Sequence, residues 1–315
     1  MSSEKKIAIT MGDPAGIGPE IIVKALKEID VSSKNIVVIG CKDIFSPVLT
    51  DIELIDTECD ISKIQPGKET AESGRASFLA LEKACNMAQN GEIQAIVTAP
   101  LSKNAINLAG YNYSGQTEVL EKFLGKQGQN KAEMLFVADD FRILLLTRHI
   151  SLSEVSKKLT KEHIVKTVNV LYSSLKKDFN IESPKLAICG LNPHSGEAGL
   201  IGREEIDIIV PAMETLKNSG INIEGLFPAD TLFVKAGKAY LNREKQPYDC
   251  YIACYHDQGL TPIKVLAMDK TVNTTIGLPV IRTSPAHGTA FDIAGKGIAD
   301  CSSMKAAIKL ALGTL

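Results

Sequence analysis

Apolar residues follow two alternating patterns along the chain, and these patterns predict strands and helices in turn. Short apolar runs such as Ile7–Thr10 and Leu186–Cys189 are typical of buried strands. Glu20–Ile29 instead repeats its apolar residues with the helical period of about 3.6. The alternation continues through most of the sequence, so it predicts an α/β fold with a mainly parallel sheet.

The composition favours a soluble globular protein and excludes several functional classes. The chain has 315 residues, enough for one large or two medium domains, of which 44% are hydrophobic and 23% charged. A net charge of −2 and the lack of basic clusters argue against binding to nucleic acid or a membrane. No apolar run approaches the roughly 18 residues of a membrane span, and the first residues contain no signal-like apolar segment. We therefore expect a cytoplasmic protein.

The seven cysteines are odd in number and scattered in spacing, a pattern that predicts reduced thiols. Several lie in apolar runs, where a free cysteine packs as a small hydrophobic side chain. Cys250 and Cys254 are four residues apart on a predicted strand. We assign both to the core rather than to a metal site.

Three of the five histidines share one position relative to the predicted strands. His149, His194 and His256 each lie at or just past the end of an apolar run. In an open parallel sheet such ends meet at one crevice. Any one of them alone is better explained as a structural histidine. Together they favour a metal site, since imidazole is the commonest protein ligand for zinc-like ions.

Two glycine-rich segments follow predicted strands. In Met11–Glu20, the loop and Pro19 at the start of the next helix form a candidate anion site. The glycine spacing, however, differs from that of a dinucleotide-binding fingerprint. Gly190–Glu205 contains four glycines around His194. It is either a ligand site or a long surface loop.

Three further polar side chains lie near strand ends or helix starts. Lys103 follows the strand Ile93–Pro100 and faces either the crevice or solvent. Thr117, in Gly115-Gln-Thr-Glu118, either binds a ligand or caps a helix. Asp230 comes after the predicted strand 222–226 and is again at a strand end.

Five segments, taken together, resemble a known family. They are Gly12-Asp-Pro-Ala-Gly-Ile-Gly-Pro-Glu20, Gly190-Leu-Asn-Pro-His-Ser-Gly-Glu-Ala-Gly199, Pro228-Ala-Asp-Thr231, Tyr255-His-Asp-Gln-Gly259 and His287-Gly-Thr-Ala290. In this order, and over nearly the whole chain, they resemble the 4-hydroxythreonine-4-phosphate dehydrogenase family. The first segment is also similar to the opening motif of isopropylmalate and isocitrate dehydrogenases, which share the fold.

The resemblance implies two α/β/α domains of the isocitrate/isopropylmalate dehydrogenase type, with the active site in the interdomain cleft. We expect a discontinuous first domain, 1–118 and 264–315, on the cofactor side. The second domain, 119–263, is expected to carry the metal ligands and the dimer interface. The resemblance also implies a homodimer with shared active sites. Each site would hold one divalent metal (zinc, magnesium or cobalt) on His149, His194 and His256, one of them lent by the partner.

The family's substrate contacts match five positions of this chain. They are Gln116, Thr117, Lys264, Asn273 and Arg282. The family has a histidine where this chain has Gln116, and an amide carries no proton charge near neutral pH. Gln116 either keeps a neutral donor for the substrate or only helps to begin a helix. In the first case, Gln116→His is expected to lower KM and to add a pH dependence near about 6.5.

The implied reaction is oxidation of 4-(phosphooxy)-L-threonine at C3 by NAD or NADP, followed by decarboxylation to 3-amino-2-oxopropyl phosphate, in pyridoxal 5'-phosphate biosynthesis. Lys103 is the candidate proton carrier, and Asp230 and Asp257 would orient histidines or neutralise the metal. No residue is assigned to the cofactor. One alternative is a dehydrogenase of D-erythronate or D-threonate 4-phosphate. Others are a phosphosugar sensor without redox activity and a metal-dependent hydrolase or aldolase.

Overall fold

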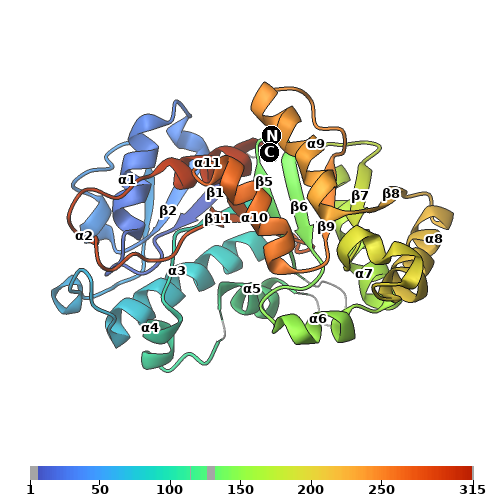
Figure 1. Ribbon diagram of the computed structural model, residues 1–315. Helices are drawn as coiled ribbons and strands as arrows, with labels where there is room; N and C mark the ends of the chain where they lie inside the picture. Colours follow the sequence, from blue (N-terminus) through green and yellow to red (C-terminus); the bar gives the residue numbers. More distant parts are fainter. Residues whose placement is uncertain (1–5, 114, 126–131, 314–315) are drawn as a thin grey trace. The chain divides into compact units, whose positions relative to one another are not determined.

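The computed structural model describes residues 6–113, 115–125 and 132–313, which form two compact units (Figure 1). The described residues up to Ala132 and from Val272 onward form the first unit, and Glu133–Thr271 form the second. The boundaries predicted at 118 and 264 fall earlier in the chain. The structure keeps α5 (Gln116–Leu124) within the first unit and all of α10 (His256–Ala267) within the second.

Six strands of the first unit lie side by side in the order β3-β2-β1-β4-β11-β10. Their bounds are β1 Ile7–Thr10, β2 Ile36–Gly40, β3 Glu53–Asp56, β4 Ala95–Thr98, β10 Val272–Ile276 and β11 Ile281–Pro285. Neighbouring strands are parallel except β10, which runs antiparallel to β11. The predicted, mainly parallel sheet is therefore observed in this unit.

The helices of the first unit cover both faces of its strands. They are α1 Gly18–Glu28, η1 Ser33–Asn35, α2 Lys42–Phe45, η2 Ile61–Lys63, α3 Ala71–Gln89, α4 Lys103–Leu108, α5 Gln116–Leu124 and α11 Ser302–Gly313. In Figure 1, α3 and α5 lie on one side of the strands, and α1 and α11 lie on the other. The α3 side packs Phe78 and Leu81 against Ile96 of β4. This face also carries Thr98 and Arg282. Thr98 is two residues after Ile96 on β4, and Arg282 of β11 is in register with Ile96, so all three side chains point to the same face.

Five strands make up the sheet of the second unit, in the order β5-β6-β9-β7-β8. Their bounds are β5 Glu133–Ala138, β6 Phe141–Leu145, β7 Lys185–Cys189, β8 Asn222–Phe227 and β9 Cys250–Ala253. The last four run parallel, and β5 pairs antiparallel with β6. The strand ends that follow β6, β9 and β7 therefore lie along one edge.

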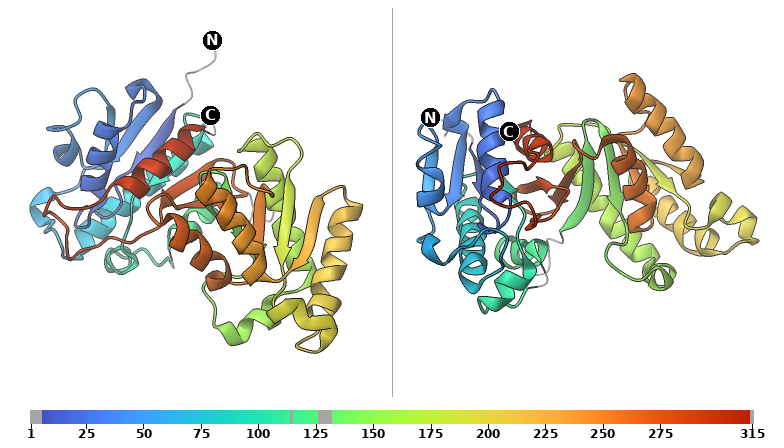
Figure 2. Two further views of the ribbon diagram at one scale, coloured as in Figure 1. Left: turned by 45° about the horizontal axis from the view of Figure 1, so that its top comes forward. Right: turned by 60° about the vertical axis from the view of Figure 1, so that its left-hand side comes forward.

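The helices of the second unit are packed on both faces of these strands. They are α6 Leu152–Lys158, α7 Lys161–Lys177, η3 Pro193–Gly199, the π-helical η4 Glu205–Ile209, α8 Val210–Asn218, α9 Ala229–Asn242 and α10 His256–Ala267. Helices α9 and α10 pack against each other (Figure 2). They bury Leu232 and Ile263 against Phe141 and Tyr251 in one core cluster. This packing holds α10 in place, and His256 is the first residue of that helix.

In three places the local sequence pattern differs from the structure. The pattern of 51–67 indicates an irregular segment, but this segment contains β3, whose four residues are exposed or half-buried. The charged, glycine-containing pattern of 236–246 indicates a surface excursion, but the segment begins with the last turns of α9. The pattern from Glu204 indicates one helix, but it starts as a π-helix and becomes α8 at Val210, one residue before Pro211. Proline lacks the N–H that a helix interior needs, so it is accommodated in the first turn.

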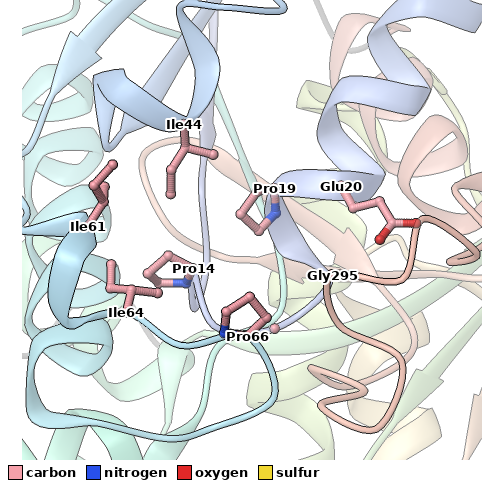
Figure 3. Close-up of a pocket in the computed structure, with 9 residues that line it drawn as sticks. Pro14, Pro19, Glu20, Ile44, Ile61, Ile64, Pro66 and Gly295 are labelled. Atoms are coloured by element: carbon pink, nitrogen blue, oxygen red, sulfur yellow. The ribbon is translucent and has the colours of Figure 1, made fainter.

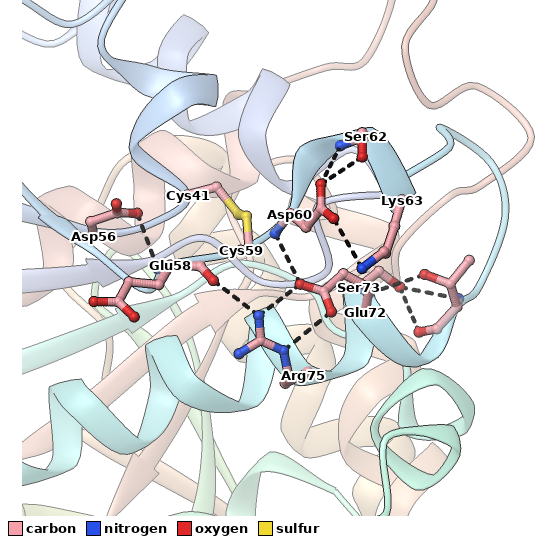
Figure 4. Close-up of polar contacts among 11 residues, drawn as sticks. Cys41, Asp56, Glu58, Cys59, Asp60, Ser62, Lys63, Glu72, Ser73 and Arg75 are labelled. Atoms are coloured by element: carbon pink, nitrogen blue, oxygen red, sulfur yellow. Dashed lines mark hydrogen bonds and ion pairs between the residues drawn. A yellow bond between two sulfur atoms is a disulfide. The ribbon is translucent and has the colours of Figure 1, made fainter.

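The expectation of seven reduced cysteines is wrong for one pair. A disulfide joins Cys41 and Cys59 (Figure 4). These residues follow the paired strands β2 and β3, which brings their Cα atoms to 5.5 Å, within disulfide range. Arg75 donates to the carbonyl oxygen of Glu58 at 2.9 Å and so holds the loop beside the disulfide. The other five cysteines, Cys250 and Cys254 among them, are buried and unpaired.

None of the helices within residues 6–113, 115–125 and 132–313 has an apolar stretch that would reach across a bilayer.

Candidate active site

Several amides of the glycine-rich loop after β1 are already hydrogen-bonded within the protein. The N–H groups of Ala15 and Gly16 donate to the side chain and carbonyl of Asp13 at 2.9 and 3.0 Å. Ile17 donates to the carbonyl of Thr289 at 3.0 Å. A side chain on Gly18 would lie 2.4 Å from the carbonyl of Met11, so this glycine serves close packing. These contacts reduce the number of amides that the loop could offer to an anion, and anion binding here stays a prediction.

Asp13 is fully buried within this loop, and we expect Asp13→Asn to remove a pH-dependent loss of stability. Burial raises the pKa of Asp13 from its usual 3.8 to about 6, since the charged form is desolvated. The folded protein therefore holds this proton more tightly than the unfolded chain. The resulting stabilisation is complete below about pH 4 and is lost as the pH rises through about 6, by on the order of 3 kcal/mol.

Thermal unfolding of the parent and of Asp13→Asn between pH 4 and 8 tests this prediction. The variant should gain melting temperature relative to the parent as the pH rises. A constant difference between the two curves would show that Asp13 does not titrate in this range.

An apolar cavity of about 280 Å³ adjoins the same loop (Figure 3). Its walls come from the glycine-rich loop, α2 and η2, and include Pro14, Ile44 and Ile64. Among the described residues that line it, Glu20 alone is charged, and its carboxylate accepts from Lys24 at 2.8 Å. None of the site residues predicted from the sequence lines this cavity. No cation among the described residues lines the cavity, so it does not fit the phosphorylated carboxylic acid that the family resemblance implies.

The buried guanidinium of Arg282 is the centre of the polar cluster in the first unit. Arg282 is 4% exposed, and its Nε donates to Thr98 Oγ1 at 2.7 Å. One of its terminal nitrogens donates to Gln116 Oε1. Burial lowers the pKa of Arg282 to about 9, so the group stays charged at neutral pH. No carboxylate among the described residues pairs with it, so its charge has no counter-ion within this part of the chain.

Of the other predicted residues of the first unit, Lys103 and Thr117 lie at the start of α5, and Asn273 lies on the sheet face that carries Arg282. A side chain at Gly115 would be 3.8 Å from Lys103 Nζ, so the Lys103 ammonium lies beside the start of α5. Gly115 is the N-cap of α5, and the suggestion that Thr117 caps this helix is therefore wrong. Asn273 shares the Arg282 face, and its Oδ1 is buried without a described partner.

Three predicted metal ligands follow three neighbouring strands of the second unit. His149, His194 and His256 come after β6, β7 and β9 respectively. These strands are parallel, with β9 between the other two. The strand-end placement that the apolar runs indicate is thus observed, whereas metal binding stays a prediction.

His149 and His256 lie close together in the chain's own fold. Their ring centroids are 5.5 Å apart. His256 Nδ1 is 2.7 Å from Asp257 Oδ1, a contact that fixes the imidazole tautomer. When the neutral ring carries its proton on Nδ1, the lone pair of Nε2 can bind a ligand. Metal-bound histidines are usually supported by such a carboxylate on their other ring nitrogen.

His194 lies in a strained turn. Residues His194–Ala198 all have positive φ, a conformation that costs non-glycine residues roughly 1–2 kcal/mol each. The buried carboxylate of Glu205 holds the turn by accepting from the backbone N–H of Asn192 at 2.7 Å and from its side chain at 2.9 Å. A side chain at Gly196 would lie 2.7 Å from that carboxylate.

His194 does not join the other two histidines in one chain. Its side chain is 71% exposed, and its nearest ionic neighbour is Glu197 at 4.0 Å. No group of three or more His, Cys, Asp or Glu in the described ranges has the arrangement to hold a metal. A single chain therefore has one pair of neighbouring histidines and, apart from it, an exposed third histidine.

The two remaining candidates belong to helices that start at strand ends. Asp230 is exposed in the first turn of α9, and Lys264 is half-buried on α10, about two turns after His256. Within the described part of the chain, neither side chain forms a hydrogen bond or an ion pair. Both are therefore available to a ligand.

Sequence reasoning missed three residues that hold the site. Thr98 orients Arg282, Glu205 holds the His194 turn, and Gln258 joins two strand ends. Gln258 accepts from the N–H of Cys254 at 2.6 Å and donates to the carbonyl of Gly190 at 2.8 Å. Two of them stand inside segments that the sequence singles out: Gln258 in the Tyr255–Gly259 motif and Glu205 at the end of Gly190–Glu205.

The likeness to known proteins covers nearly the whole chain. The family model described as pyridoxal phosphate biosynthetic protein PdxA matches residues 8–311. A 4-hydroxythreonine-4-phosphate dehydrogenase of Nostoc sp. is 43% identical over 97% of this chain and 92% of that protein. A protein of Oceanobacillus iheyensis, provisionally named a D-threonate 4-phosphate dehydrogenase, is 39% identical over 99% of this chain and 98% of that protein.

Solved structures agree with the sequence relatives. The crystal structure of 4-hydroxythreonine-4-phosphate dehydrogenase from Klebsiella pneumoniae has a TM-score of 0.86 and 36% identity, over 98% of this chain and 99% of that one. A beta-decarboxylating dehydrogenase from Thermococcus kodakarensis, 18% identical with a TM-score of 0.55, shares the fold. The predicted fold class and the resemblance based on five motifs are both confirmed. The chain belongs to the PdxA family of pyridoxal phosphate biosynthetic proteins.

Proposed function

We propose that this chain oxidises 4-(phosphooxy)-L-threonine at C3 with NAD or NADP and then decarboxylates the product to 3-amino-2-oxopropyl phosphate, in pyridoxal 5'-phosphate biosynthesis. The chain is an oxidoreductase of the PdxA family, and relatives over nearly its whole length are named for this dehydrogenase. The structural observation that best supports the proposal is the setting of Arg282: it is a buried cation without a counter-ion among the described residues. Such a group fits a phosphorylated carboxylate.

The donor set of the second unit fits a divalent metal. His149 and His256 are neighbours, and Asp257 supports the imidazole of His256 as outer ligands do. We assign these two, together with His194 of a second subunit, as the residues that would hold one zinc, magnesium or cobalt ion. When bound, such an ion supplies a Lewis acid that lowers the cost of negative charge on the substrate oxygen.

The side chains of this chain have distinct roles in the proposed reaction. Arg282 and Lys264 bind the two anionic ends of the substrate, and Lys103 carries the proton released from the hydroxyl group. When bound, the nicotinamide cofactor would accept the hydride from C3, and the β-keto acid formed would then lose carbon dioxide. Asp257 holds His256 in one tautomer. Asp230, exposed at the start of α9, balances charge near the histidines.

The separate position of His194 supports a shared site in a homodimer. Exposed apolar side chains follow His194 in sequence, with Leu200 85% exposed and Ile201 and Ile206 each more than two-fifths exposed. Burying them against a second copy would favour association. The turn would then present His194 to the histidine pair of the partner, consistent with two equivalent sites per dimer.

Mixing two inactive variants tests the shared site. His194→Ala and His256→Ala proteins, allowed to exchange subunits, should regenerate about a quarter of the active sites. Half of the randomly formed dimers are mixed, and each mixed dimer has one intact site of two. A mixture of His149→Ala and His256→Ala should regenerate none, because these residues come from the same chain. Equal recovery in both mixtures, or none in the first despite proven exchange, would refute the arrangement.

The runner-up substrate is D-threonate or D-erythronate 4-phosphate. The relative from Oceanobacillus iheyensis and the glutamine at position 116 are the observations that favour it. A substrate panel, read by the absorbance of reduced nicotinamide, separates the alternatives. We expect the highest kcat/KM with 4-(phosphooxy)-L-threonine; a higher value with either sugar-acid phosphate would reassign the substrate.

Membership of a dehydrogenase family argues against the sensor, hydrolase and aldolase alternatives. A cytoplasmic location stays a prediction.

A further inference from the structure

We propose that Thr98 is a positioning residue: together with Gln116, it holds the guanidinium of Arg282 so that the remaining N–H donors bind the phosphate of the substrate. The identity of the substrate rests on the proposed function. The existence of the phosphate subsite does not, and it is tested below with inorganic phosphate.

The three side chains form a closed network on one face of the first unit's sheet. Thr98 ends β4 and is 1% exposed, and its Oγ1 accepts from Arg282 Nε at 2.7 Å. The same hydroxyl lies 2.6 Å from Gln116 Oε1, to which it donates. Gln116 Oε1 also accepts from Arg282, and Gln116 Nε2 donates to the carbonyl of Ala99 at 3.2 Å. Each polar atom of the Gln116 amide therefore has a protein partner.

These contacts leave part of the guanidinium unused. Of its five N–H donors, the network takes one on Nε and one on a terminal nitrogen. The others have no acceptor within the described residues, although the side chain is 96% buried. An unpaired buried cation is costly unless an anion completes it. A phosphate matches the planar fork of a guanidinium, and Lys103, beside Gly115, adds a second cation.

The neutral character of the two partners explains why this cation remains available. A carboxylate at either position would neutralise Arg282 within the protein, and an imidazolium would repel it. The hydroxyl of Thr98 and the amide of Gln116 accept hydrogen bonds without a formal charge. They fix the direction of the guanidinium and leave its charge for the ligand. In this proposal Gln116 acts through Arg282, and the second N–H of its amide keeps the alternative of a direct contact with substrate as a prediction.

Binding of inorganic phosphate to the full-length protein, measured by calorimetric titration, tests the proposal. Thr98→Val keeps the size of the side chain but removes the hydroxyl, and should raise the Kd for phosphate about 10- to 100-fold, as expected for one hydrogen bond to a charged group. Thr98→Ser is the matched control: it loses a methyl group but keeps the hydroxyl, and should bind phosphate within about threefold of the parent.

A second variant separates positioning from folding. Gln116→Glu keeps the oxygen that accepts from Arg282 and adds the missing counter-charge. It should weaken phosphate binding more than Thr98→Val does, while its melting temperature stays equal to or above that of the parent. A residue needed only for stability would show the opposite, with a lower melting temperature and unchanged affinity.

Steady-state kinetics with 4-(phosphooxy)-L-threonine should show an increase in KM for Thr98→Val with a smaller change in kcat, and Thr98→Ser should restore KM. The proposal is overturned if the parent does not bind phosphate, if Thr98→Val binds it as the parent does, or if Thr98→Ser and Thr98→Val lose equal affinity. Phosphate binding that follows the expected order in a protein without dehydrogenase activity would leave this subsite standing and refute the proposed function alone.

Discussion

Replacement of His194 by alanine is expected to reduce metal-dependent turnover to background while the protein stays folded. The side chain is 71% exposed, and its only ion-pair neighbour among the described residues is Glu197 at 4.0 Å, so it contributes little to stability. Loss of a direct metal ligand should exceed the 10- to 100-fold cost that is typical of outer-shell partners. The measurements are turnover with saturating metal, metal content and melting temperature.

The backbone of His194 supplies a sharper control. At φ 50° alanine carries the same left-handed strain as histidine, whereas glycine carries none. His194→Gly should therefore melt at or above the temperature of His194→Ala and be equally inactive. His163→Gln, a substitution in α7 outside the three-histidine set, should keep its turnover. Activity above background in His194→Gly would show that the imidazole is not required.

Replacement of Arg282 by methionine is expected to reduce kcat/KM for the phosphorylated substrate by more than about 100-fold and to stabilise the fold. The loss follows because a charge-assisted, two-pronged contact with phosphate disappears. The gain follows because the desolvation that lowers the pKa of Arg282 to about 9 disfavours the charged folded form at neutral pH. This cost is relieved only as the pH rises above about 9. Exchanging such a buried charge for an apolar side chain should add about 1–4 kcal/mol to the free energy of unfolding.

Arg282→Lys is the matched control for this prediction. It keeps a positive charge but loses the planar fork and the Nε contact with Thr98, so kcat/KM should fall between the values of the parent and Arg282→Met. Chemical unfolding and steady-state kinetics of the three proteins give both quantities. A destabilised Arg282→Met protein would mean that the guanidinium is a structural group and not a held binding site.

The sequence predicts the placement of the histidines because local rules govern it. His149, His194 and His256 each follow an apolar run. When such runs form parallel strands, the residues that follow them lie at the carboxyl-end edge of the sheet. The sequence patterns do not reveal which strands are neighbours, so the 5.5 Å approach of His149 and His256 is visible only in the fold. The exposed setting of His194 is likewise a tertiary property.

Other features depend on distant contacts that leave no local pattern. The disulfide requires that Cys41 and Cys59 follow two paired strands, one of which, β3, has too weak an alternation to be predicted. The role of Thr98 arises because β4 lies in register with β11, which brings a threonine and an arginine 184 residues apart into contact. Without knowledge of this contact, a threonine at the end of an apolar run would be interpreted only as part of the hydrophobic core.

The most direct measurement is the appearance of reduced nicotinamide when the protein is mixed with a divalent metal, NAD or NADP and 4-(phosphooxy)-L-threonine, with released carbon dioxide counted in the same reaction. The account predicts a rise in near-ultraviolet absorbance that stops when the metal is chelated, with one carbon dioxide released for each cofactor reduced. Absence of cofactor reduction with this substrate, or reduction without loss of carbon dioxide, would contradict it.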